Sequence, residues 1–510
     1  MWLAFLVVTL FVVKSNANGC VLRSFGTDKF VCVCNATHCD ETLDNDPKVP
    51  PEGNFYWYVS TKTGLRLNMT EGQFSENRRS PFASSVTLTV NSTKKYQTIF
   101  GFGGAFTDSA GIQISKLSKP TQDQLIRAYF HPKRGSGYTL GRVPIGGTDF
   151  STRPYTYDDV ENDVSLEHFS LAKEDYDYKI PYIRKALEFN PELKLFGVPW
   201  TAPPWMRTDD KFNGCGFLKN EYYQVYTNYI LKFLNEYEKN GLDMWAISTG
   251  NEPGNAIDPQ DPVNSMAWTP GTVANWVAKF LGPSLAASKH NNTMILGVED
   301  QRVYFPWYVK ELFSNEQAKK YITGTTVHWY TDAIAPAKVL DETHDAFPDK
   351  FILMTEACTG TPDDPPRVDV GSWPRGEKYF LSIIEYTRHW TVGWIDWNIA
   401  LDKTGGPNWI NNAVDSPIIV NAETDEFYKQ PMYHALKHFG RFIHRGSTRI
   451  CITDDNDIKA NAFITPSNEI VVVLYNKRNI STNVIIQDLK KGSFHVELPA
   501  QSMNTILYKN

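Results

Sequence analysis

The sequence of 510 residues has little that would suit a membrane-spanning protein, a nucleic-acid-binding protein or a repeat protein. Beyond the N-terminus no stretch contains 18 uncharged apolar residues, so we expect the mature chain not to span a membrane. The net charge is -6 and no dense basic patch occurs, which argues against nucleic acid as a partner because binding of phosphates requires such a patch. Internal repeats, low-complexity tracts and calcium-loop patterns are also absent, and we expect no metal site.

One short apolar run does stand at the N-terminus, from Trp2 to Val13, and the small residues Ser15–Ala17 follow it. The run is too short to cross a bilayer comfortably, and small residues are what a signal peptidase reads. We therefore predict that residues 1–17 are a cleaved secretory signal peptide. A single membrane anchor is the alternative.

The cysteines agree with an oxidising compartment. Four of the seven crowd near the start of the predicted mature chain: Cys20, Cys32, Cys34 and Cys39. This crowding predicts two local disulfides with three possible pairings, and a metal cluster is the alternative. The other cysteines are expected to be free and mostly buried: Cys215, Cys358 and Cys451. Five N-x-S/T sequons predict glycosylation at Asn35, Asn68, Asn91, Asn291 and Asn479.

Between about residues 96 and 400, short apolar runs alternate with amphipathic stretches. The runs predicted to be strands are 96–106, 138–147, 193–200, 242–253, 293–300, 322–330, 351–357 and 391–398. The predicted helices are 121–130, 177–189, 221–240, 271–288, 306–319 and 377–389. This alternation predicts an α/β fold, the TIM (β/α)8 barrel. An open doubly wound sheet is less favoured, because GFGGAFTD lacks the full spacing of a glycine-rich phosphate loop.

The two ends of the chain have a different pattern. Residues 46–95 and 447–510 carry short segments of alternating polarity and almost no helix signal. Such segments are typical of antiparallel strands. We therefore predict one discontinuous β-sandwich that is assembled from both ends of the chain.

Two glutamates stand where predicted barrel strands end. Glu252 stands at the end of the fourth strand and Glu356 at the end of the seventh. TIM barrels carry their catalytic groups at the carboxyl ends of the strands. Glycoside hydrolysis needs two carboxyl groups, one to protonate the leaving oxygen and one to attack the anomeric carbon. The pair therefore predicts a glycosidase, while a structural ion pair is the alternative for either residue.

Several long blocks carry a more specific signal. They are CVCNATHCD at Cys32–Asp40, GFGGAFTD at Gly101–Asp108, GRVPIGGTDFS at Gly141–Ser151, PWTAPPW at Pro199–Trp205, HWYTDAIAPAK at His328–Lys338, GWIDWNIAL at Gly393–Leu401, GGPNWINNAVDSPIIV at Gly405–Val420 and FYKQPMYH at Phe427–His434. With the two glutamate motifs, these blocks resemble glycoside hydrolase family 30, and most closely its animal lysosomal acid glucosylceramidases. The resemblance covers essentially the whole predicted mature chain.

The resemblance implies the catalytic roles. Glu252 would be the acid/base and Glu356 the nucleophile of a retaining β-glucosidase. The residues that would bind the substrate or position the glutamates are Asp149, Trp200, Asn251, His328, Tyr330, Trp397 and Asn412. Arg142 would support the nucleophile electrostatically. Residues His328 and Tyr330 are also expected to share a face, because they are two apart on a predicted strand.

The resemblance also implies the disulfides Cys20–Cys32 and Cys34–Cys39, and three domains. These would be a small disulfide-containing β-sheet (18–45 with 399–430), the β-sandwich (46–95 with 447–510) and the barrel (96–398 with 431–446). The implied reaction is hydrolysis of glucosylceramide to glucose and ceramide in the lysosome lumen, by double displacement and without a cofactor. The implied partners are a membrane surface contacted peripherally, a saposin-like activator and anionic lipid.

The segment after Glu356 departs from the family pattern. Thr359–Arg367 is acidic and proline-rich where relatives often carry apolar aromatic residues, and Ala413 is smaller than the expected aromatic. We further expect the two glutamates to titrate as a coupled pair, with the pKa of Glu252 raised. The alternatives to a glucosylceramidase are another family-30-like activity, such as a β-xylosidase or β-1,6-glucanase, and a catalytically silent glycolipid-binding protein.

Overall fold

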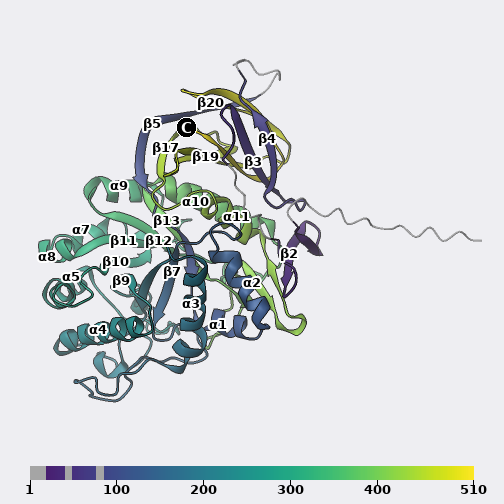
Figure 1. Ribbon diagram of the computed structural model, residues 1–510. Coiled ribbons are helices and arrows are strands. Elements are labelled where there is room, and N and C mark those ends of the chain that lie inside the picture. Colours follow the sequence, from purple (N-terminus) through teal and green to yellow (C-terminus); the bar gives the residue numbers. More distant parts are fainter. Residues whose placement is uncertain (1–18, 41–48, 76–84) are drawn as a thin grey trace, which may run out of the picture.

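The computed structural model describes residues 19–40, 49–75 and 85–510 (Figure 1). The predicted signal peptide, residues 1–17, lies outside these ranges. Three sheets organise the described chain: a closed barrel, a nine-stranded sheet and a five-stranded sheet. In the described ranges, no helix combines the length and the apolar character needed to cross a bilayer.

The barrel closes in chain order, and all of its strand pairs are parallel. Its strands are β6 Gly101–Ala105, β7 Leu140–Ile145, β8 Lys194–Pro199, β9 Met244–Ser248, β10 Met294–Gln301, β11 Ile322–His328, β12 Phe351–Glu356 and β13 Thr391–Asn398. They are almost fully buried, as expected for parallel strands with side chains packed inside the barrel and helices outside. The predicted TIM barrel is confirmed.

The first predicted strand is too long. Tyr96–Thr98 belong to β5 (Val86–Thr98), which pairs with β17 (Thr448–Ile452) of the nine-stranded sheet. Only Gly101–Ala105 form the barrel strand β6. Here Gly103 is required by close packing, since a Cβ atom at this position would lie 2.0 Å from the carbonyl oxygen of Leu140. One apolar run therefore contains the end of one sheet and the start of another.

The helices surround the barrel (Figure 1). They are α1 Asp108–Ser115, α2 Lys119–Phe130, α3 Ile180–Phe189, α4 Tyr223–Lys239, α5 Pro270–Trp276, α6 Gly282–Ala286, α7 Trp307–Leu312, α8 Glu316–Tyr321, α9 Lys338–Ala346, α10 Trp373–Arg388 and α11 Pro431–Gly440. The predicted helix 306–319 is two helices, because the side chain of Asn315 accepts hydrogen bonds from the first turn of α8 and starts it afresh. The predicted helix 271–288 is also divided, since a π-helical turn (Val277–Leu281) joins α5 to α6.

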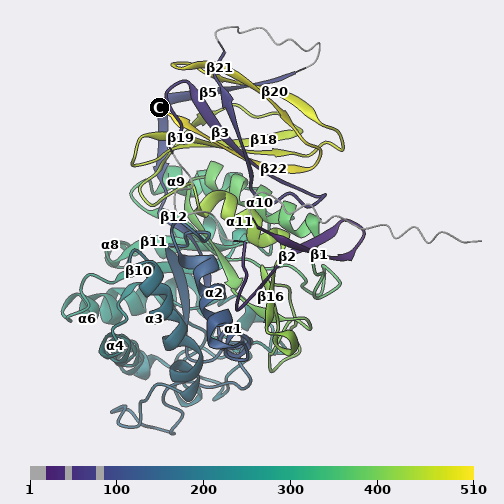
Figure 2. The same cartoon turned by 45° about the vertical axis from the view of Figure 1, so that its right-hand side comes forward.

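The nine-stranded sheet takes strands from both ends of the chain, in the order β21-β20-β5-β17-β18-β19-β22-β3-β4. Besides β5 and β17, its strands are β3 Asn54–Thr61, β4 Asn68–Gln73, β18 Ile458–Ile464, β19 Glu469–Asn476, β20 Thr482–Asp488, β21 Gly492–Leu498 and β22 Ser502–Lys509. The sheet lies over α10 and α11 (Figure 2). His438 joins α11 to the sheet. Its Nδ1 atom lies 2.8 Å from the Thr505 hydroxyl, and its Nε2 atom lies 2.8 Å from the Ser60 hydroxyl.

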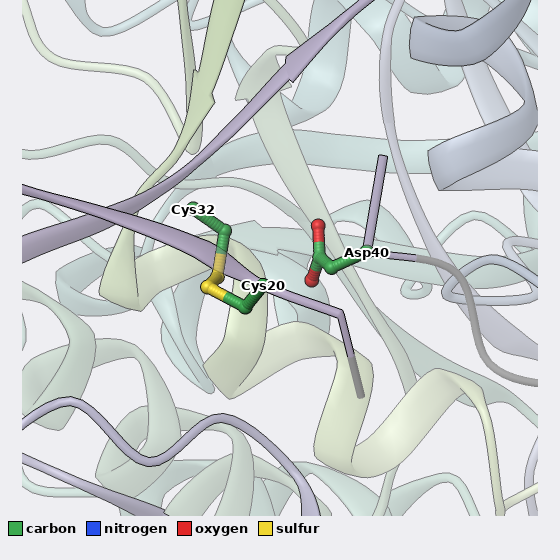
Figure 3. A group of neighbouring side chains, drawn as sticks. All are labelled: Cys20, Cys32 and Asp40. Carbon is green, nitrogen blue, oxygen red and sulfur yellow. A yellow bond between two sulfur atoms is a disulfide. The ribbon is translucent and has the colours of Figure 1, made fainter. Parts of the chain in front are cut away.

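The five-stranded sheet has the order β1-β2-β16-β15-β14. Its strands are β1 Val21–Gly26, β2 Lys29–Asn35, β14 Leu401–Asp402, β15 Ile418–Asn421 and β16 Glu426–Lys429. The expected disulfides are confirmed: Cys20–Cys32 and Cys34–Cys39. Beside the first disulfide lies Asp40 (Figure 3), whose carboxylate pairs with the buried ammonium group of Lys429 at 2.9 Å.

The other three cysteines are free, as expected. Their burial was predicted less well, since Cys358 is buried but Cys215 is exposed and Cys451 is only partly covered. Cys215 lies in the long loop that follows β8, where the chain runs over the surface. Residue type alone therefore does not predict whether a cysteine in such a loop is buried.

Candidate active site

A pocket of about 200 Å³ opens among the loops that follow the carboxyl ends of the barrel strands. Its lining includes most of the predicted site residues: Asp149, Trp200, Asn251, Glu252, Tyr330, Glu356, Trp397 and Asn412. Arg142 and His328 are fully buried directly beneath the two glutamates. The structure thus brings together all ten residues that the sequence singled out for chemistry or binding.

Glu252 lies in the loop after β9 and is held by three donors. Its Oε1 atom is 2.6 Å from Gln301 Nε2 and 2.7 Å from His328 Nδ1, and its Oε2 atom accepts from Asn255 Nδ2 at 2.8 Å. Its backbone N–H donates to the carbonyl of Glu299 at 2.9 Å. The residue has a φ of 40°, which a non-glycine residue rarely adopts. The carboxyl group is therefore fixed in both position and direction.

Glu356 ends β12 and faces Glu252. Its Oε2 atom is 2.6 Å from Arg142 Nη1, and its Oε1 atom accepts from the Tyr330 hydroxyl at 3.0 Å. One oxygen of each glutamate and one ring nitrogen of His328 lie within 4.8 Å of one another. Retaining glycosidases place their carboxyl groups about 5–5.5 Å apart, whereas inverting enzymes need about 6.5–9.5 Å. The two glutamates therefore approach more closely than the carboxyl groups of an inverting enzyme.

Two tryptophans and a carboxyl–amide pair form the walls beside the glutamates. The rings of Trp200 and Trp397 stack with centroids 5.3 Å apart, and both lie about 5 Å from the guanidinium carbon of Arg142. Across the pocket, Asn412 Nδ2 donates to Asp149 Oδ2 at 3.0 Å. Flat rings and fixed polar groups together can hold the apolar faces and the hydroxyls of a sugar.

Sequence reasoning missed three residues that hold the catalytic groups: Asn255, Glu299 and Gln301. Gln301 and Asn255 donate to Glu252, while Glu299 contacts Arg142 and His328. Two of them could have been found, because Glu299 and Gln301 stand at the carboxyl end of the fifth barrel strand. The side-chain direction of Asn255 depends on a loop conformation that carries no such signal.

Comparison with known proteins agrees with this geometry. The model of the "Glycosyl hydrolase family 30 TIM-barrel domain" matches residues 99–443, and that of the "Glycosyl hydrolase family 30 beta sandwich domain" matches residues 446–506. The chain belongs to glycosyl hydrolase family 30. Its relatives include the lysosomal acid glucosylceramidase of Mus musculus, which is 40% identical over 97% of this chain and 96% of the relative.

Solved structures of similar proteins have the same architecture. The crystal structure of SrfJ from Salmonella typhimurium is 28% identical, covers 90% of this chain and 100% of its own, and superposes with a TM-score of 0.83. The endo-beta1,6-glucanase BT3312 is 25% identical, with the same coverage and a TM-score of 0.80. Among these relatives, the mouse protein is similar over the greatest share of the chain.

The protonation of this family-30 site centres on His328. Burial disfavours its charged form, but the negative charge of Glu356 and the hydrogen bonds to Glu252 and Glu299 outweigh it and raise the pKa of His328 to about 10. Burial also disfavours the ionised form of Glu299, yet Arg142 and His328 lower its pKa to about 2. The site therefore holds an imidazolium and a guanidinium among three glutamates.

The pKa shifts of the two catalytic candidates run opposite to our expectation. Burial opposes ionisation of Glu252, but the hydrogen bond and charge of His328 dominate and lower its pKa. Burial raises the pKa of Glu356 despite the opposing charge of Arg142. The sequence could not show this, because the shifts follow from which glutamate the buried imidazolium contacts.

The family-30 pocket is bordered by the acidic, proline-rich segment after Glu356. Thr361 and Pro362 of this segment line the entrance, and Pro362 and Asp363 are exposed. The guanidinium of Arg375 binds the carbonyl groups of Asp364 and Pro366 and fixes the segment from behind. This acidic, proline-rich segment therefore lies directly at the entrance to the pocket.

The described residues offer three groupings with the donor types of a metal site. Two consist of disulfide-bonded cysteines with Asp40 (Figure 3), and their sulfurs cannot act as the thiolates that metals bind. The third consists of Glu252, His328 and Glu356. Here the guanidinium of Arg142 and the imidazolium of His328 already compensate the carboxylates. One His-x-x-x-His pair also occurs, His434 and His438 in α11, but His438 hydrogen-bonds to two hydroxyls instead.

Proposed function

We propose that this protein is a retaining β-glucosidase that hydrolyses glucosylceramide and related β-glucosides. The observation that carries the proposal is the approach of the Glu252 and Glu356 carboxyl oxygens within one pocket to within 4.8 Å, closer than the roughly 6.5–9.5 Å that an inverting enzyme needs to place a water molecule. The 40% identity to the mouse lysosomal acid glucosylceramidase supports glucosylceramide as the substrate.

In the first step, an ionised Glu356 attacks the anomeric carbon while Glu252 protonates the glycosidic oxygen. The bond to the aglycone breaks, ceramide leaves as the alcohol, and a glucosyl ester of Glu356 forms. In the second step, Glu252 accepts a proton from water, and the resulting hydroxyl attacks the anomeric carbon. The ester bond breaks, glucose leaves with retained configuration, and both glutamates return to their starting states.

The first step requires a proton on Glu252, although its pKa is lowered in the ligand-free structure. The 2.7 Å hydrogen bond between His328 Nδ1 and Glu252 Oε1 supplies this proton. An imidazolium beside a carboxylate differs from an imidazole beside a carboxylic acid only in the position of one proton along that bond. The His328–Glu252 pair therefore carries the acid as a unit.

The surrounding residues suit a bound glucose unit. Asn251 accepts from Arg142 Nη2 through its side-chain oxygen at 2.5 Å, which leaves its amide N–H groups for the sugar 2-hydroxyl. Burial and the charge of Glu356 raise the pKa of Asp149 to about 7, so that it is largely a neutral acid at acidic pH and can donate to hydroxyls as well as accept from them. The indoles of Trp200 and Trp397 would cover an apolar face of the ring.

The identity to a lysosomal relative also supports a lysosomal location, reached through the secretory pathway. Glucosylceramide is held in membranes, so we infer peripheral contact with a lipid surface, aided by anionic lipid and a saposin-like activator. All five sequons are at least partly exposed, with Asn291 and Asn479 the most accessible. Glycosylation there predicts a loss of mass when the secreted protein is treated with an N-glycanase.

A substrate panel at about pH 5 tests the proposal. Glucosylceramide, galactosylceramide, an aryl β-xyloside and β-1,6-glucan are compared with and without anionic lipid, and we expect glucosylceramide to be preferred. Preferred turnover of β-1,6-glucan would instead assign the activity of the solved glucanase relative. The variant Glu356→Gln should show no turnover of an aryl β-glucoside, and full activity in that variant would contradict the nucleophile assignment.

A further inference from the structure

A β-bulge near the end of β10 directs residues of this strand toward the catalytic groups. The pairing of β10 with β11 shifts between Val298 and Asp300, which leaves Glu299 as the extra residue. Val298 and Glu299 have φ angles of 77° and 53°, a region that non-glycine residues, and β-branched ones above all, rarely adopt. Bulges and strained residues of this kind re-aim side chains and concentrate at functional sites.

The carboxylate of Glu299 joins the two cations of the site. Its Oε1 atom is 3.1 Å from Arg142 Nε, 2.9 Å from Arg142 Nη2 and 3.2 Å from His328 Nε2. The side chain is fully buried. Arg142 in turn binds Glu356, and His328 binds Glu252. Glu299 therefore touches the support of each catalytic glutamate without touching either carboxyl group.

Both ring nitrogens of His328 face carboxylate oxygens. The charged and titratable groups around it are Glu252 from the loop after β9, Glu299 and Asp300 from β10, Glu356 from β12, Arg142 from β7 and Tyr330 from the loop after β11. An ionised carboxylate can only accept a hydrogen bond, so each of these contacts requires a proton on the nitrogen. The contact at Nε2 thus keeps a proton on that nitrogen as long as Glu299 is ionised, on whichever side of the Nδ1–Glu252 hydrogen bond the other proton lies.

We propose that Glu299 is a positioning residue of the reaction. It holds a proton on His328 Nε2, and its negative charge helps the His328–Glu252 pair to retain the further proton that the leaving group receives. The same carboxylate fixes the guanidinium of Arg142 against Glu356. This inference rests on the proposed glycosidase function and adds a third glutamate to it. The lowered pKa of Glu299 and the raised pKa of His328 agree with this arrangement.

The variant Glu299→Gln tests the inference, because it keeps the size of the side chain and removes its charge. Without the charge, the His328–Glu252 pair should lose its proton at lower pH. We expect the alkaline limb of kcat/KM to move down by roughly one pH unit, the lower end of the effect of a close opposite charge.

The loss should also depend on the leaving group. A dinitrophenyl β-glucoside releases a good leaving group and needs little acid catalysis, whereas an alkyl β-glucoside needs it fully. We expect kcat/KM to fall by roughly 10- to 100-fold for the alkyl glucoside, less than the roughly 100- to 10,000-fold that general acid catalysis contributes, because the acid is weakened and not removed. For the dinitrophenyl glucoside we expect a fall of no more than about threefold, since the nucleophile remains in place.

Two further variants separate positioning from folding. Glu299→Asp keeps a carboxylate and should retain the wild-type alkaline limb even if its overall rate is lower. Asp175→Asn removes an equally buried carboxylate, which pairs with Lys179 at 3.0 Å in the helical layer. It should lower the melting temperature without changing the pH profile or the leaving-group dependence.

An unmoved alkaline limb in folded Glu299→Gln, or equal losses on both glucosides, would overturn the inference. If Glu299→Gln does not fold, Glu299→Asp decides the matter. A wild-type alkaline limb together with a larger loss on the alkyl glucoside than on the dinitrophenyl glucoside supports the positioning role. Equal losses on both glucosides in Glu299→Asp overturn it. Wild-type turnover of the same glucosides tests the proposed function separately, because it does not depend on any of these variants.

Discussion

The hydroxyl of Tyr330 is the neutral donor to the proposed nucleophile, and its removal gives a prediction that can be worked out from the structure. The hydroxyl donates to Glu356 Oε1 at 3.0 Å and lies 3.3 Å from the sulfur of Cys358. The substitution Tyr330→Phe deletes this oxygen and keeps the ring, which is in van der Waals contact with the pocket wall. Glu356 would keep Arg142 as its charged partner.

The magnitude follows from the chemistry of the lost contact. A hydrogen bond to a charged group contributes about 1.5–3 kcal/mol, and each 1.36 kcal/mol of barrier is tenfold in rate. If the contact is fully used in the transition state, kcat/KM should fall by about 10- to 150-fold. The hydroxyl also lowers the pKa of Glu356, so its removal should move the acidic limb of the pH profile to higher pH.

The assay is the pH profile of kcat/KM on an aryl β-glucoside, with the melting temperature measured in parallel. Tyr237→Phe is the matched control, because the Tyr237 hydroxyl donates to the buried carboxylate of Asp175 at 2.7 Å outside the pocket. The control should lose stability but keep its activity per folded molecule. A Tyr330→Phe enzyme with wild-type kcat/KM and an unmoved acidic limb would refute the reasoning.

Two further predictions concern stability. Burial raises the pKa of Asp149 to about 7, so its carboxyl group is mostly neutral below that pH in the folded protein. In the unfolded chain the same group ionises above about pH 4. The contribution of this group to the free energy of unfolding therefore decreases as pH rises from about 4 to 7. The melting temperature of Asp149→Asn should therefore fall less between pH 5 and pH 7 than that of the wild type, and an equal fall would contradict the assigned shift. Removal of the Cys20–Cys32 disulfide by a double alanine substitution should cost about 3 kcal/mol, by analogy with a loop of about 15 residues, and kcat/KM should be unchanged in the folded fraction.

The barrel could be predicted because its strands are buried on both faces. Such strands read as nearly continuous apolar runs, and all eight predicted runs overlap strands of the closed barrel. The helix boundaries are harder to predict, since a single side chain such as that of Asn315 can start a new helix within one amphipathic stretch. The end of β5 was joined to β6 for a similar reason, because an apolar run does not reveal which sheet its residues pair with.

The two glutamates can be predicted from their place at the carboxyl ends of the fourth and seventh strands, a rule that depends only on chain order. The same rule applies to Glu299, which stands near the end of the fifth strand. The rule does not single out Glu299, because a run that ends in Val298-Glu299-Asp300 does not show which carboxylate faces inward. The bulge at that point decides the matter, and its conformation depends on pairing with β11.

The sequence by itself determined the order of the strands, the pair of glutamates and the cysteines available for cross-linking, because these follow from residue type and spacing along the chain. The tertiary structure alone decided which glutamate meets the buried imidazolium and which meets the guanidinium. It thereby set the direction of both pKa shifts. The physical reason is that electrostatic shifts depend on distances of a few ångströms between residues far apart in the chain, such as His328 and Glu252, and on the burial that removes water from between them.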